Sequence, residues 1–424
     1  MELKKYKLGD VADIVNGATP STHNSENYDG SIIWITPKDL SGQKQKIIRR
    51  GQRNISEIGF NNCSAQMIPP YNILMSSRAP IGLLAINENE CCTNQGFKNL
   101  VLDKSICDTD YMYYYLQFHM KEIEALGSGT TFKEISKSAL QGIEIRLPDL
   151  EKQRDIAKCL SDLDRKIELN KQINDNLEAM AKQLYDYWFV QFDFPNEEGK
   201  PYKSSGGAMV YNEKMKREIP QGWTAANIFD ELSVQYGFPF STGLFTEEPT
   251  NIPVVRIRDI LENSVSAYSR EEADEKYKLQ KQDLLIGMDG NFHMNYWNDN
   301  VSYLNQRSVR LRANPNSTVS ILQARYDIAP YIKAKELRAK GSTVGHLSDK
   351  DLKGLFVLVS PNADFRNKFD SILAEIIENR CEIESLTKQR DELLPLLMNG
   401  QATINYHLSA SFLSSLYYIE TNTN

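Results

Sequence analysis

Two stretches of the chain carry apolar side chains at helical spacing over an unusual length. The first runs from Asp149, a suitable helix cap, to Phe192. Its apolar positions recur about every 3.5 residues, Asn170 lies within the seam, and charged or amide side chains fill the other faces. The stripe consists of Ile156, Leu160, Leu163, Ile167, Ile173, Leu177, Met180 and Leu184. This pattern predicts an amphipathic helix roughly 65 Å long at 1.5 Å per residue.

A second stretch near the C-terminus repeats the spacing, with Asn379 and Arg390 as polar interruptions. Its stripe consists of Phe365, Phe369, Ile372, Ile376, Ile383, Leu386, Leu393 and Leu397. A single amphipathic helix usually packs on an ordinary core. Stripes this long need a long partner, however, and each follows a strand-like run and a proline (Pro148 and Pro361). We therefore expect the two helices to form a coiled coil that holds two similar domains apart.

The chain also contains an internal repeat. Residues 8–17 match residues 228–237 at an offset of 220, and residues 34–40 match residues 254–260 at the same offset. Later matches occur at offsets of 211 and 212, so the second copy is shorter in one loop. They pair Asn72 with Asp283, Asn94-Gln95 with Asn305-Gln306, and 129–136 with 341–348. Chance would scatter these offsets, and the pattern therefore predicts a tandem duplication.

The predicted fold class is α/β (α+β): two tandem mixed α/β domains and two long helices, with a pseudo-two-fold internal repeat. In the first copy, strands are expected at 32–35, 72–76, 82–86 and 99–102, and a helix at 110–126. The expected boundaries are 1–148 for the first domain, 149–193 for the first long helix, 194–218 for a linker, 219–361 for the second domain, 362–400 for the second long helix, and 401–424 for a tail of unassigned role.

Composition narrows the class of protein. The net charge is −7, no run is apolar enough for a membrane span, and the first residues do not form a signal peptide. The six cysteines include no CxxC pair, and the five histidines form no HxxxH or HxxE cluster. We expect a cytoplasmic protein with reduced thiols, no metal site and no membrane partner.

Motifs for chemistry are incomplete. Met67-Ile-Pro-Pro-Tyr71 is one residue from the Asn/Asp-Pro-Pro-Tyr sequence with which amino-methyltransferases hold adenine. Ile68 stands at the essential position and cannot accept a hydrogen bond from the amino group. The sequence also lacks a GxxxxGK[ST] nucleotide loop. We therefore expect no catalytic residues in this chain.

Several segments, in this order along the chain, resemble the specificity subunit of Type I restriction–modification enzymes. They are Leu8-Gly-Asp with Gly17-Ala-Thr-Pro20, Ser77-Arg-Ala-Pro-Ile-Gly82, Thr93-Asn-Gln-Gly96, Leu147-Pro-Asp-Leu-Glu-Lys-Gln-Arg-Asp-Ile156, Trp188-Phe-Val-Gln-Phe-Asp193, Ile219-Pro-Gln-Gly-Trp223 and Arg390-Asp-Glu-Leu-Leu-Pro-Leu-Leu-Met-Asn-Gly400. The resemblance runs from about residue 3 to residue 404.

The resemblance implies a phage-defence function without catalysis. Each of two target recognition domains would read one half of a bipartite DNA sequence. The two long helices would pair antiparallel, set the spacer between the half-sites and bind two adenine-N6 methyltransferase subunits. Restriction subunits would join them in the full complex. This chain would bind no cofactor, whereas S-adenosylmethionine, ATP and magnesium would belong to its partners.

Candidate DNA-binding residues are cations for phosphates and polar side chains for base edges. In the first domain they are Thr19, Lys38, Lys46, Arg49, Arg50, Arg53, Ser77, Arg78, Asn94, Gln95, Thr130 and Lys133. In the second they are Arg256, Arg258, Asn291, His293, Asn305, Gln306, Arg307 and Lys340. The alternatives are a solvated charged face and, for Arg78, a surface ion pair. The second copy has Asp289 where the first has Arg78, so the role of Arg78 does not carry over directly.

The segment that ends the first long helix leaves two interpretations open. Tyr187, Trp188, Phe189 and Phe192 would either pack the helix end or dock a methyltransferase subunit. For the whole chain, the alternative function is a non-enzymatic coiled-coil adaptor whose globular domains bind proteins. Domains held over one face of a duplex would lie about one helical turn apart, near 10 base pairs. That spacing predicts a split target with an unread gap of roughly six to eight base pairs.

Overall fold

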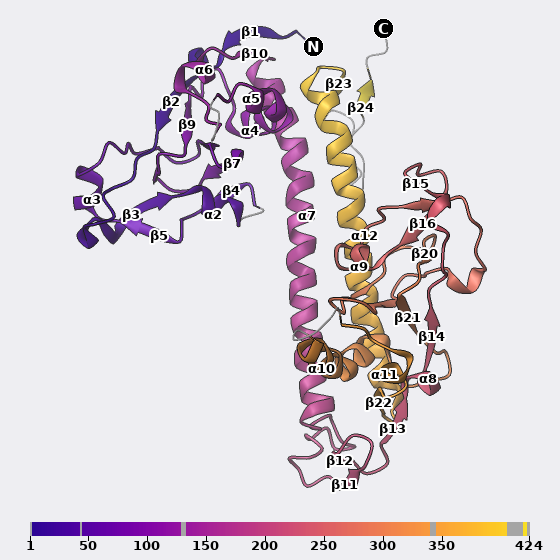
Figure 1. Cartoon of the computed structure of the whole chain (residues 1–424). Helices are drawn as coiled ribbons and strands as arrows, with labels where there is room; N and C mark the ends of the chain where they lie inside the picture. The colour runs from indigo at the N-terminus through magenta and orange to yellow at the C-terminus, as the bar shows by residue number, and fades with distance from the viewer. Residues whose placement is uncertain (1, 43–44, 129–132, 340–344, 405–418, 422–424) are drawn as a thin grey trace. The chain divides into compact units, whose positions relative to one another are not determined.

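A computed structural model describes residues 2–42, 45–128, 133–339, 345–404 and 419–421 (Figure 1). The chain forms two compact units. Unit 1 contains residues 1–168 and 385–424, and unit 2 contains residues 169–384. Because the boundaries fall within the two long helices, each unit holds one globular domain and one part of each helix.

Two sheets form the frame of unit 1. The five-stranded sheet has the order β2-β9-β6-β7-β4, and the three-stranded sheet has the order β5-β3-β8. Their strands are β2 (Ala12–Asn16), β3 (Tyr28–Ile35), β4 (Ile47–Ile48), β5 (Arg53–Ile55), β6 (Ile73–Ser77), β7 (Ile81–Asn87), β8 (Cys92–Thr93) and β9 (Lys98–Leu102). Every residue of β6 is buried, because both faces of this strand are covered. All four strand predictions for the first copy are confirmed.

The helices of unit 1 are short apart from those on its flank. The predicted helix at 110–126 is present as two, α4 (Thr109–Phe118) and α5 (Met120–Ala125), because His119 leaves helical geometry with φ −90° and ψ 11°. The remaining elements are β1 (Lys4–Lys7), α1 (Leu8–Val11), α2 (Pro37–Ser41), α3 (Glu57–Asn61), α6 (Lys137–Gln141) and β10 (Glu144–Leu147). Asp108 caps α4 by accepting a hydrogen bond from the Tyr111 backbone N–H.

Unit 2 repeats this arrangement. Its sheets have the orders β14-β21-β18-β19, β15-β17-β16-β20 and β13-β22. The strands are β13 (Thr224–Asn227), β14 (Leu232–Tyr236), β15 (Phe245–Thr246), β16 (Ile252–Val255), β17 (Tyr268–Ser269), β18 (Leu284–Gly287), β19 (Met294–Tyr296), β20 (Tyr303–Leu304), β21 (Ser308–Ala313) and β22 (Phe356–Val359). The helices are α8 (Ile228–Glu231), α9 (Ile257–Glu262), α10 (Ile321–Ala339) and α11 (Asp349–Leu352).

The predicted repeat is confirmed contact by contact. Ile14 pairs with Leu100 across β2 and β9, and Val234 pairs with Leu311 across β14 and β21. Backbone hydrogen bonds repeat in the same way. Equivalent pairs are Leu8 N to Ile143 O and Ile228 N to Leu355 O, Asn94 N to Ile35 O and Asn305 N to Val255 O, and Ile135 N to Ser77 O and Leu347 N to Met288 O.

One close approach explains why a glycine recurs in both copies. A Cβ atom built on Gly17 would lie 1.9 Å from the carbonyl oxygen of Asn94. A Cβ atom on Gly237 would lie 1.9 Å from the carbonyl oxygen of Asn305. Real side chains cannot occupy that space, so both copies need glycine directly after β2 (Ala12–Asn16) and β14 (Leu232–Tyr236), beside the Asn-Gln segment.

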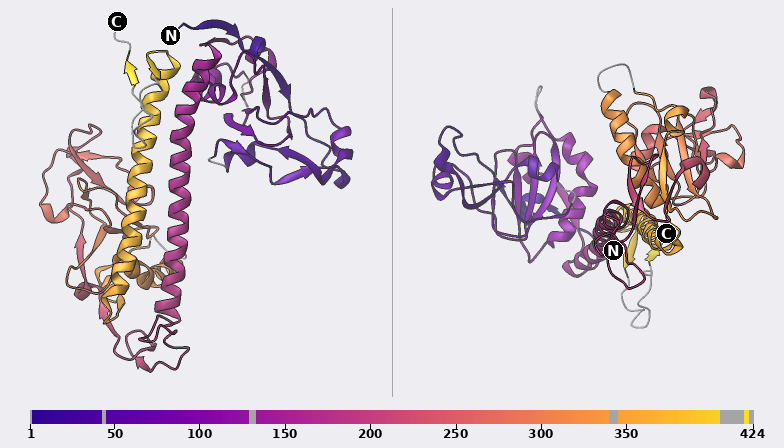
Figure 2. Two further views of the ribbon diagram at one scale, coloured as in Figure 1. Left: turned by 180° about the vertical axis from the view of Figure 1, so that it is seen from behind. Right: turned by 90° about the horizontal axis from the view of Figure 1, so that it is seen from below.

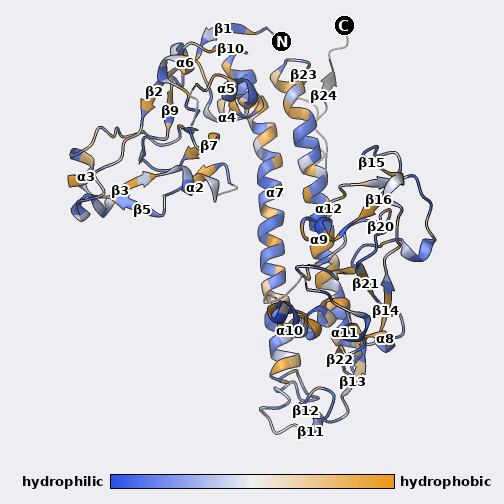
Figure 3. Ribbon diagram, in the orientation of Figure 1, coloured by the Kyte–Doolittle hydropathy of each residue, from blue (hydrophilic) through white to orange (hydrophobic). Residues whose placement is uncertain are grey.

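The long helices are α7 (Leu150–Tyr185), which continues as a π-helical turn at Asp186–Val190, and α12 (Ala363–Met398). As predicted, Asp149 caps α7, accepting a hydrogen bond of 2.9 Å from the Lys152 backbone N–H. Apolar and polar positions alternate along both helices (Figure 3). The apolar stripe of α7 faces inward at Ile156, Leu160, Leu163 and Ile167, all of which are buried.

Within each unit, α7 and α12 lie side by side (Figures 1 and 2). In unit 2, Asn170 binds Glu382 at 2.7 Å, and Asn174 donates to the Ile376 carbonyl at 3.2 Å. A higher number on α7 therefore meets a lower number on α12, which confirms the antiparallel prediction. Asn379 also donates to Asn174 at 2.9 Å, and such a polar pair in an apolar seam specifies register.

The segment expected as a linker contains more structure than its Pro, Gly and Ser content indicated. Met209–Asn212 (β11) and Arg217–Pro220 (β12) form an antiparallel hairpin. In the tail, Ala402–Ile404 (β23) pairs with Ile419–Thr421 (β24). No helix in the described ranges combines the length and hydropathy needed to span a membrane.

Candidate nucleic-acid interface

Polar side chains from distant parts of the sequence meet at one end of the unit 1 sheets. β2 and β6 both lie antiparallel to β9, so both end where β9 begins. β3 and β8 run parallel and end together. The loops that follow these four strand ends form what we name edge 1, at residues 17–20, 36–38, 78 and 94–96, with 133–134 alongside.

Contacts show that edge 1 is continuous. The Thr19 hydroxyl hydrogen-bonds the side-chain oxygen of Gln95. A Cβ atom built on Gly96 would lie 3.1 Å from Asn94 Oδ1, 3.2 Å from Pro37 Cγ and 3.8 Å from Arg78 Cγ. Four of the predicted DNA-binding residues are therefore neighbours in space: Thr19, Arg78, Asn94 and Gln95. Gln95 is exposed, and Asn94 is half-buried.

Arg78 has a carboxylate partner. Its Nη1 lies 3.6 Å from Glu134 Oε2, and Lys98 Nζ lies 3.2 Å from Glu134 Oε1. This is the surface ion pair that the sequence left as an alternative. The Arg78 side chain is 37% exposed, so its remaining donors stay accessible at the edge. Lys133, beside Glu134, is exposed.

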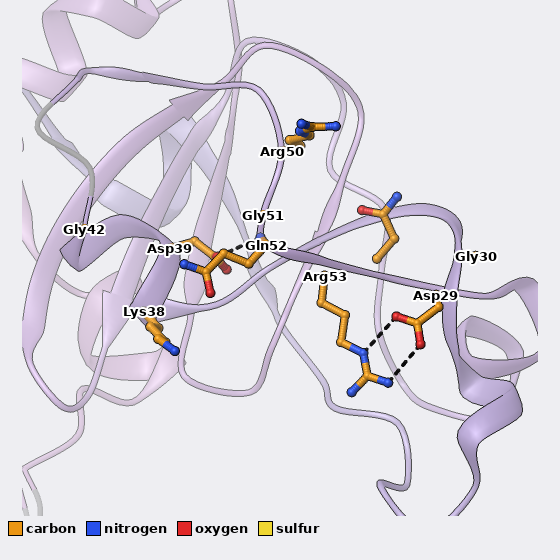
Figure 4. A pocket seen from close by; sticks show the side chains of 10 residues that line it. Asp29, Gly30, Lys38, Asp39, Gly42, Arg50, Gly51, Gln52 and Arg53 are labelled. Carbon is orange, nitrogen blue, oxygen red and sulfur yellow. Dashed lines mark hydrogen bonds and ion pairs between the residues drawn. The ribbon is translucent and has the colours of Figure 1, made fainter.

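A cleft of about 670 Å³ lies beside edge 1 and gathers three predicted cations, Lys38, Arg50 and Arg53 (Figure 4). Arg53 forks onto Asp29 at 3.1 and 3.2 Å, and this hydrogen bonding lowers the pKa of Asp29. Among the residues that the structure describes, no carboxylate lies within ion-pair distance of Lys38 or Arg50. These two cations are therefore available to an anionic ligand.

The second acid of this cleft has a structural role. Asp39 Oδ2 accepts a hydrogen bond from the Thr36 backbone N–H at 2.8 Å, and Asp39 Oδ1 accepts one from the Gln52 backbone N–H at 2.8 Å. Asp39 thus caps α2 and fixes the adjoining turn. Its charge is directed at the backbone, which leaves the cleft wall to the basic side chains.

Two further predicted cations are paired. Lys46 Nζ lies 2.6 Å from Asp110 Oδ1 and 2.8 Å from Ser161 Oγ, and its side chain is only 16% exposed. It ties the start of β4 to α4 and α7, so we do not propose it as a phosphate contact. Arg49 lies 2.8 Å from Glu88 but is 79% exposed. A surface pair of this kind exchanges partners at little cost.

Other predicted residues lie elsewhere. Ser77 is fully buried beneath edge 1, so its hydroxyl cannot meet a duplex in this conformation; this corrects the sequence-based prediction. Thr130 and Lys340 fall outside the described residues.

Unit 2 builds the corresponding edge 2 from residues 237–240, 256–258, 289–293, 305–307 and 345–346. The Met288 N–H donates to the Arg307 carbonyl at 2.9 Å, as the Ser77 N–H donates to the Gly96 carbonyl at 2.7 Å. Gln306 and Arg307 are exposed, and Asn305 is half-buried. Asn291 is exposed and His293 half-buried on the loop after β18.

The two arginines before α9 differ. Arg256 donates to the Ser266 side chain and carbonyl at 2.5 and 2.8 Å and is 25% exposed, so it is held in the domain. Arg258 is 68% exposed, and the Asp259 oxygen nearest to it is 3.9 Å away. Arg258 is therefore the better placed of the two for a phosphate.

An acid and a histidine at edge 2 were missed by sequence reasoning. Asp289 Oδ2 lies 2.9 Å from Arg307 Nη1, and Asp289 Oδ1 lies 2.6 Å from His346 Nδ1. His346 is 58% exposed. The repeat could have indicated this contact, because Asp289 and His346 stand at the positions of Arg78 and Glu134. The isolated β-bridge between positions 78 and 134 recurs between 289 and 346.

The aromatic segment at the end of α7 packs inward. Trp188, Phe189 and Phe192 are at most 4% exposed. Their rings meet Trp223 and Phe365, with centroids 4.7 to 6.1 Å apart. The packing interpretation therefore holds for these three residues, and a docking surface built on them is not proposed. Tyr187 alone of the four is exposed, at 38%.

In the part of the chain that the structure describes, no three His, Cys, Asp or Glu residues are grouped to hold a metal ion. Each unit instead carries an edge of amides, arginines and short polar loops. The fold and these edges together define a class: a recognition protein with two related domains on a pair of long helices.

Comparison with known proteins identifies the family. The family model described as "Type I restriction modification DNA specificity domain" matches residues 1–179. The chain is 32% identical over 413 residues to the MjaIX Type I specificity subunit of Methanocaldococcus jannaschii, covering 94% of this chain and 93% of that protein. It is 26% identical over 193 residues to the EcoBI specificity subunit of Escherichia coli, covering 44% and 40% of the two chains.

A solved structure supports the fold. The Type I restriction–modification S subunit from M. genitalium superposes with a TM-score of 0.61 at 16% identity, covering 94% of this chain and 96% of that one. The chain belongs to the family of Type I restriction enzyme specificity subunits, which are non-catalytic.

Proposed function

We propose that this chain is the DNA-recognition subunit of a Type I restriction–modification complex and that each edge reads one half of a split target. The observation that supports this proposal most strongly is that edge 1 and edge 2 are built in the same way. The same strand ends and backbone hydrogen bonds place Asn94 and Gln95 in unit 1 and Asn305 and Gln306 in unit 2, and in each unit the glutamine is exposed. An amide side chain can donate to adenine N7 and accept from the adenine N6 amino group at once. Different neighbours beside the repeated amides suit two different half-sites.

The paired helices act as the spacer in this proposal. α7 alone is roughly 54 Å long at 1.5 Å per residue, and buried Asn174 and half-buried Asn379 hold it in one register with α12. We propose that two adenine-N6 methyltransferase subunits dock along these helices and that restriction subunits complete the assembly. S-adenosylmethionine, ATP and magnesium would then be held by those partners.

The acidic balance of the chain fits a subunit that works within a complex. Its net charge is −7, and among the described edge residues the best placed cations are Lys38 and Arg50, with no carboxylate in ion-pair distance, and exposed Arg258, 3.9 Å from Asp259. Phosphate neutralisation supplies most non-specific DNA affinity. We therefore propose that the partner subunits provide much of the non-specific DNA affinity, whereas the two edges provide sequence discrimination.

Binding measurements test the proposal. The chain is purified alone and with its methyltransferase partner and titrated with duplexes carrying the methylated motif or a scrambled one. We expect sequence-specific, salt-dependent binding by the complex and weak binding by the chain alone. A complex that assembles but binds both duplexes equally would contradict the proposal. Capture of proteins through the two domains, without DNA preference, would support the adaptor alternative.

A further inference from the structure

The pair of acidic and basic side chains at edge 1 recurs at edge 2 with its two positions exchanged. In unit 1 the cation Arg78 follows β6 and its carboxylate, Glu134, lies on the facing segment. In unit 2 the carboxylate Asp289 follows β18 and the facing segment carries His346. The backbone bridge between the two segments is present in both units. The scaffold is therefore the same, whereas the acidic and basic side chains have exchanged places.

The exchange leaves edge 2 with an arginine at a new position. Arg307 stands where unit 1 has Gly96, as the matching hydrogen bonds from Met288 N and Ser77 N show. Its Nη1 is held at 2.9 Å by Asp289 Oδ2, and its side chain is 70% exposed. The guanidinium is thus fixed at one end and open to solvent at the other.

Two features separate Arg307 from an ordinary surface arginine. Its φ is +64°, a backbone conformation that favours glycine and is uncommon for a long side chain. Asp289 is also only 19% exposed and is shared with His346, whose Nδ1 lies 2.6 Å away. Burial alone would raise the pKa of Asp289. The hydrogen bonds that its carboxylate accepts from His346 and Arg307, and the charge interactions with these residues, outweigh burial and lower the pKa. The carboxylate therefore stays ionised and oriented towards both partners.

We propose that Arg307 reads a guanine in the half-site of unit 2 and that Asp289 positions it, with His346 as the second group held by the same carboxylate. A guanidinium presents parallel N–H donors that match guanine O6 and N7 in the major groove, and a carboxylate that binds one end of the fork limits its rotation. This inference rests on the proposed function. It adds that edge 2 reads with an arginine from the 305–307 loop, where edge 1 would use Arg78 from the end of β6.

The left-handed backbone of Arg307 provides a variant that should fold well. Arg307→Gly removes the guanidinium and relieves the unfavourable φ, so its melting temperature should not fall below that of the parent. Lys216→Gly is the matched control, because Lys216 is an exposed basic residue of the same unit, on the β11–β12 turn, with φ +51°. Both variants lose one positive charge at a left-handed position, and only one of them lies at edge 2.

The test uses the complex with its methyltransferase partner and a panel of duplexes in which each target position is changed in turn. Arg307→Gly should lose at least tenfold discrimination at one guanine of one half-site, and Lys216→Gly should change none. Arg307→Lys should not restore discrimination, because an ammonium lacks the fork. Asp289→Asn should reduce discrimination at the same guanine by a smaller factor. Arg78→Ala is included so that the other half-site reports independently.

Each outcome has a separate meaning. Equal loss on every duplex would assign Arg307 to a phosphate and overturn the inference. An unchanged panel for Arg307→Gly, with relaxation by Arg78→Ala, would overturn the inference and leave the proposed function standing. A parent complex without sequence preference would contradict the proposed function itself.

Discussion

Edge 1 and edge 2 share a backbone frame and differ in the side chains mounted on it. Gly17 lies against the backbone carbonyl of Asn94, and Gly237 lies equally close to the backbone carbonyl of Asn305. Beside them, Arg78 faces Glu134 in unit 1, and Asp289 faces His346 in unit 2. A frame that is fixed by backbone hydrogen bonds tolerates exchange of charged side chains at its rim. This separation of frame from rim is what a protein with two different half-sites requires.

The two units also hold their domains to the helices by different cations. In unit 1, Lys46 bonds Asp110 and Ser161 at 2.6 and 2.8 Å. In unit 2, Arg380 of α12 bonds Asn295 and Glu178 at 3.0 and 3.1 Å. A basic residue close in sequence to a recognition edge is therefore not always a ligand for phosphate.

The largest change in stability is expected at the two glycines that lie closest to a neighbouring backbone carbonyl. Gly17→Ala and Gly237→Ala each place a methyl group against a backbone carbonyl that cannot move without its strand, and each should destabilise its unit by about 3 kcal/mol. Gly243→Ala is the control, because nothing lies within 4 Å of its Cβ position and its change should stay within about 0.5 kcal/mol. Urea unfolding measures all three. If Gly17→Ala left the free energy of unfolding unchanged, the backbone around Gly17 would be able to move apart and make room for a side chain.

The next largest effect is expected on the DNA sequence discrimination of each edge, measured separately. Gln95, whose side-chain oxygen is bonded by Thr19, presents its amide at edge 1, and Gln306 is exposed at edge 2. Gln95→Ala should relax one half-site by roughly 1–3 kcal/mol, and Gln306→Ala should relax the other. Competition titrations with half-site variants measure both. Equal loss at both half-sites for either variant would assign that glutamine to the scaffold.

A third prediction concerns a buried acid in unit 2. Burial raises the pKa of Asp327 to about 6, although its carboxylate accepts hydrogen bonds from Tyr185 and the Leu358 N–H. The folded pKa exceeds the unfolded value of 3.8, so the folded state binds the proton more tightly and unit 2 gains stability as the pH falls through about 6. In unit 1, the described carboxylates with a resolved shift, Asp29 and Asp103, have lowered pKa values.

Asp327→Asn removes this titration. Between pH 7.5 and 5, the parent should gain on the order of 1 kcal/mol of stability relative to the variant, because about one pKa unit of the difference is realised over that range. Urea unfolding of parent and variant at both pH values gives the comparison. Parallel pH dependence in the two proteins would show that Asp327 is not the titrating group.

The smallest effect at physiological salt concerns the phosphate contacts proposed for the edge 1 cleft. Lys38→Ala with Arg50→Ala should flatten the dependence of log Kd on log salt by about two units and weaken all sequences alike. Lys46→Met tests the other role, because its ammonium is bonded within the unit. That variant should lower stability and leave the salt slope unchanged. A reduced slope for Lys46→Met would instead return Lys46 to the interface.

The sequence predicts what depends on local period or on repetition. Apolar spacing predicts α7 and α12, and the offsets of 220 and then 211 to 212 predict two related domains. The sequence could not predict which individual side chains meet across long separations. The bond from Lys46 to Ser161 joins residues 115 positions apart, and Trp188 is covered by Phe365 from the far end of the chain. The break at His119 and the β11–β12 hairpin depend on tertiary packing, which overrides weak local signals.

The central claim is that the two edges read the two halves of one split DNA target. The most direct measurement is the adenine methylome of cells that carry this chain and its partner subunits, compared with cells lacking its gene and cells carrying Gln95→Ala. We predict one split motif with a gap of roughly six to eight base pairs, lost without the gene and relaxed in one half by Gln95→Ala. A continuous motif, or a motif unchanged by loss of the gene, would contradict the account.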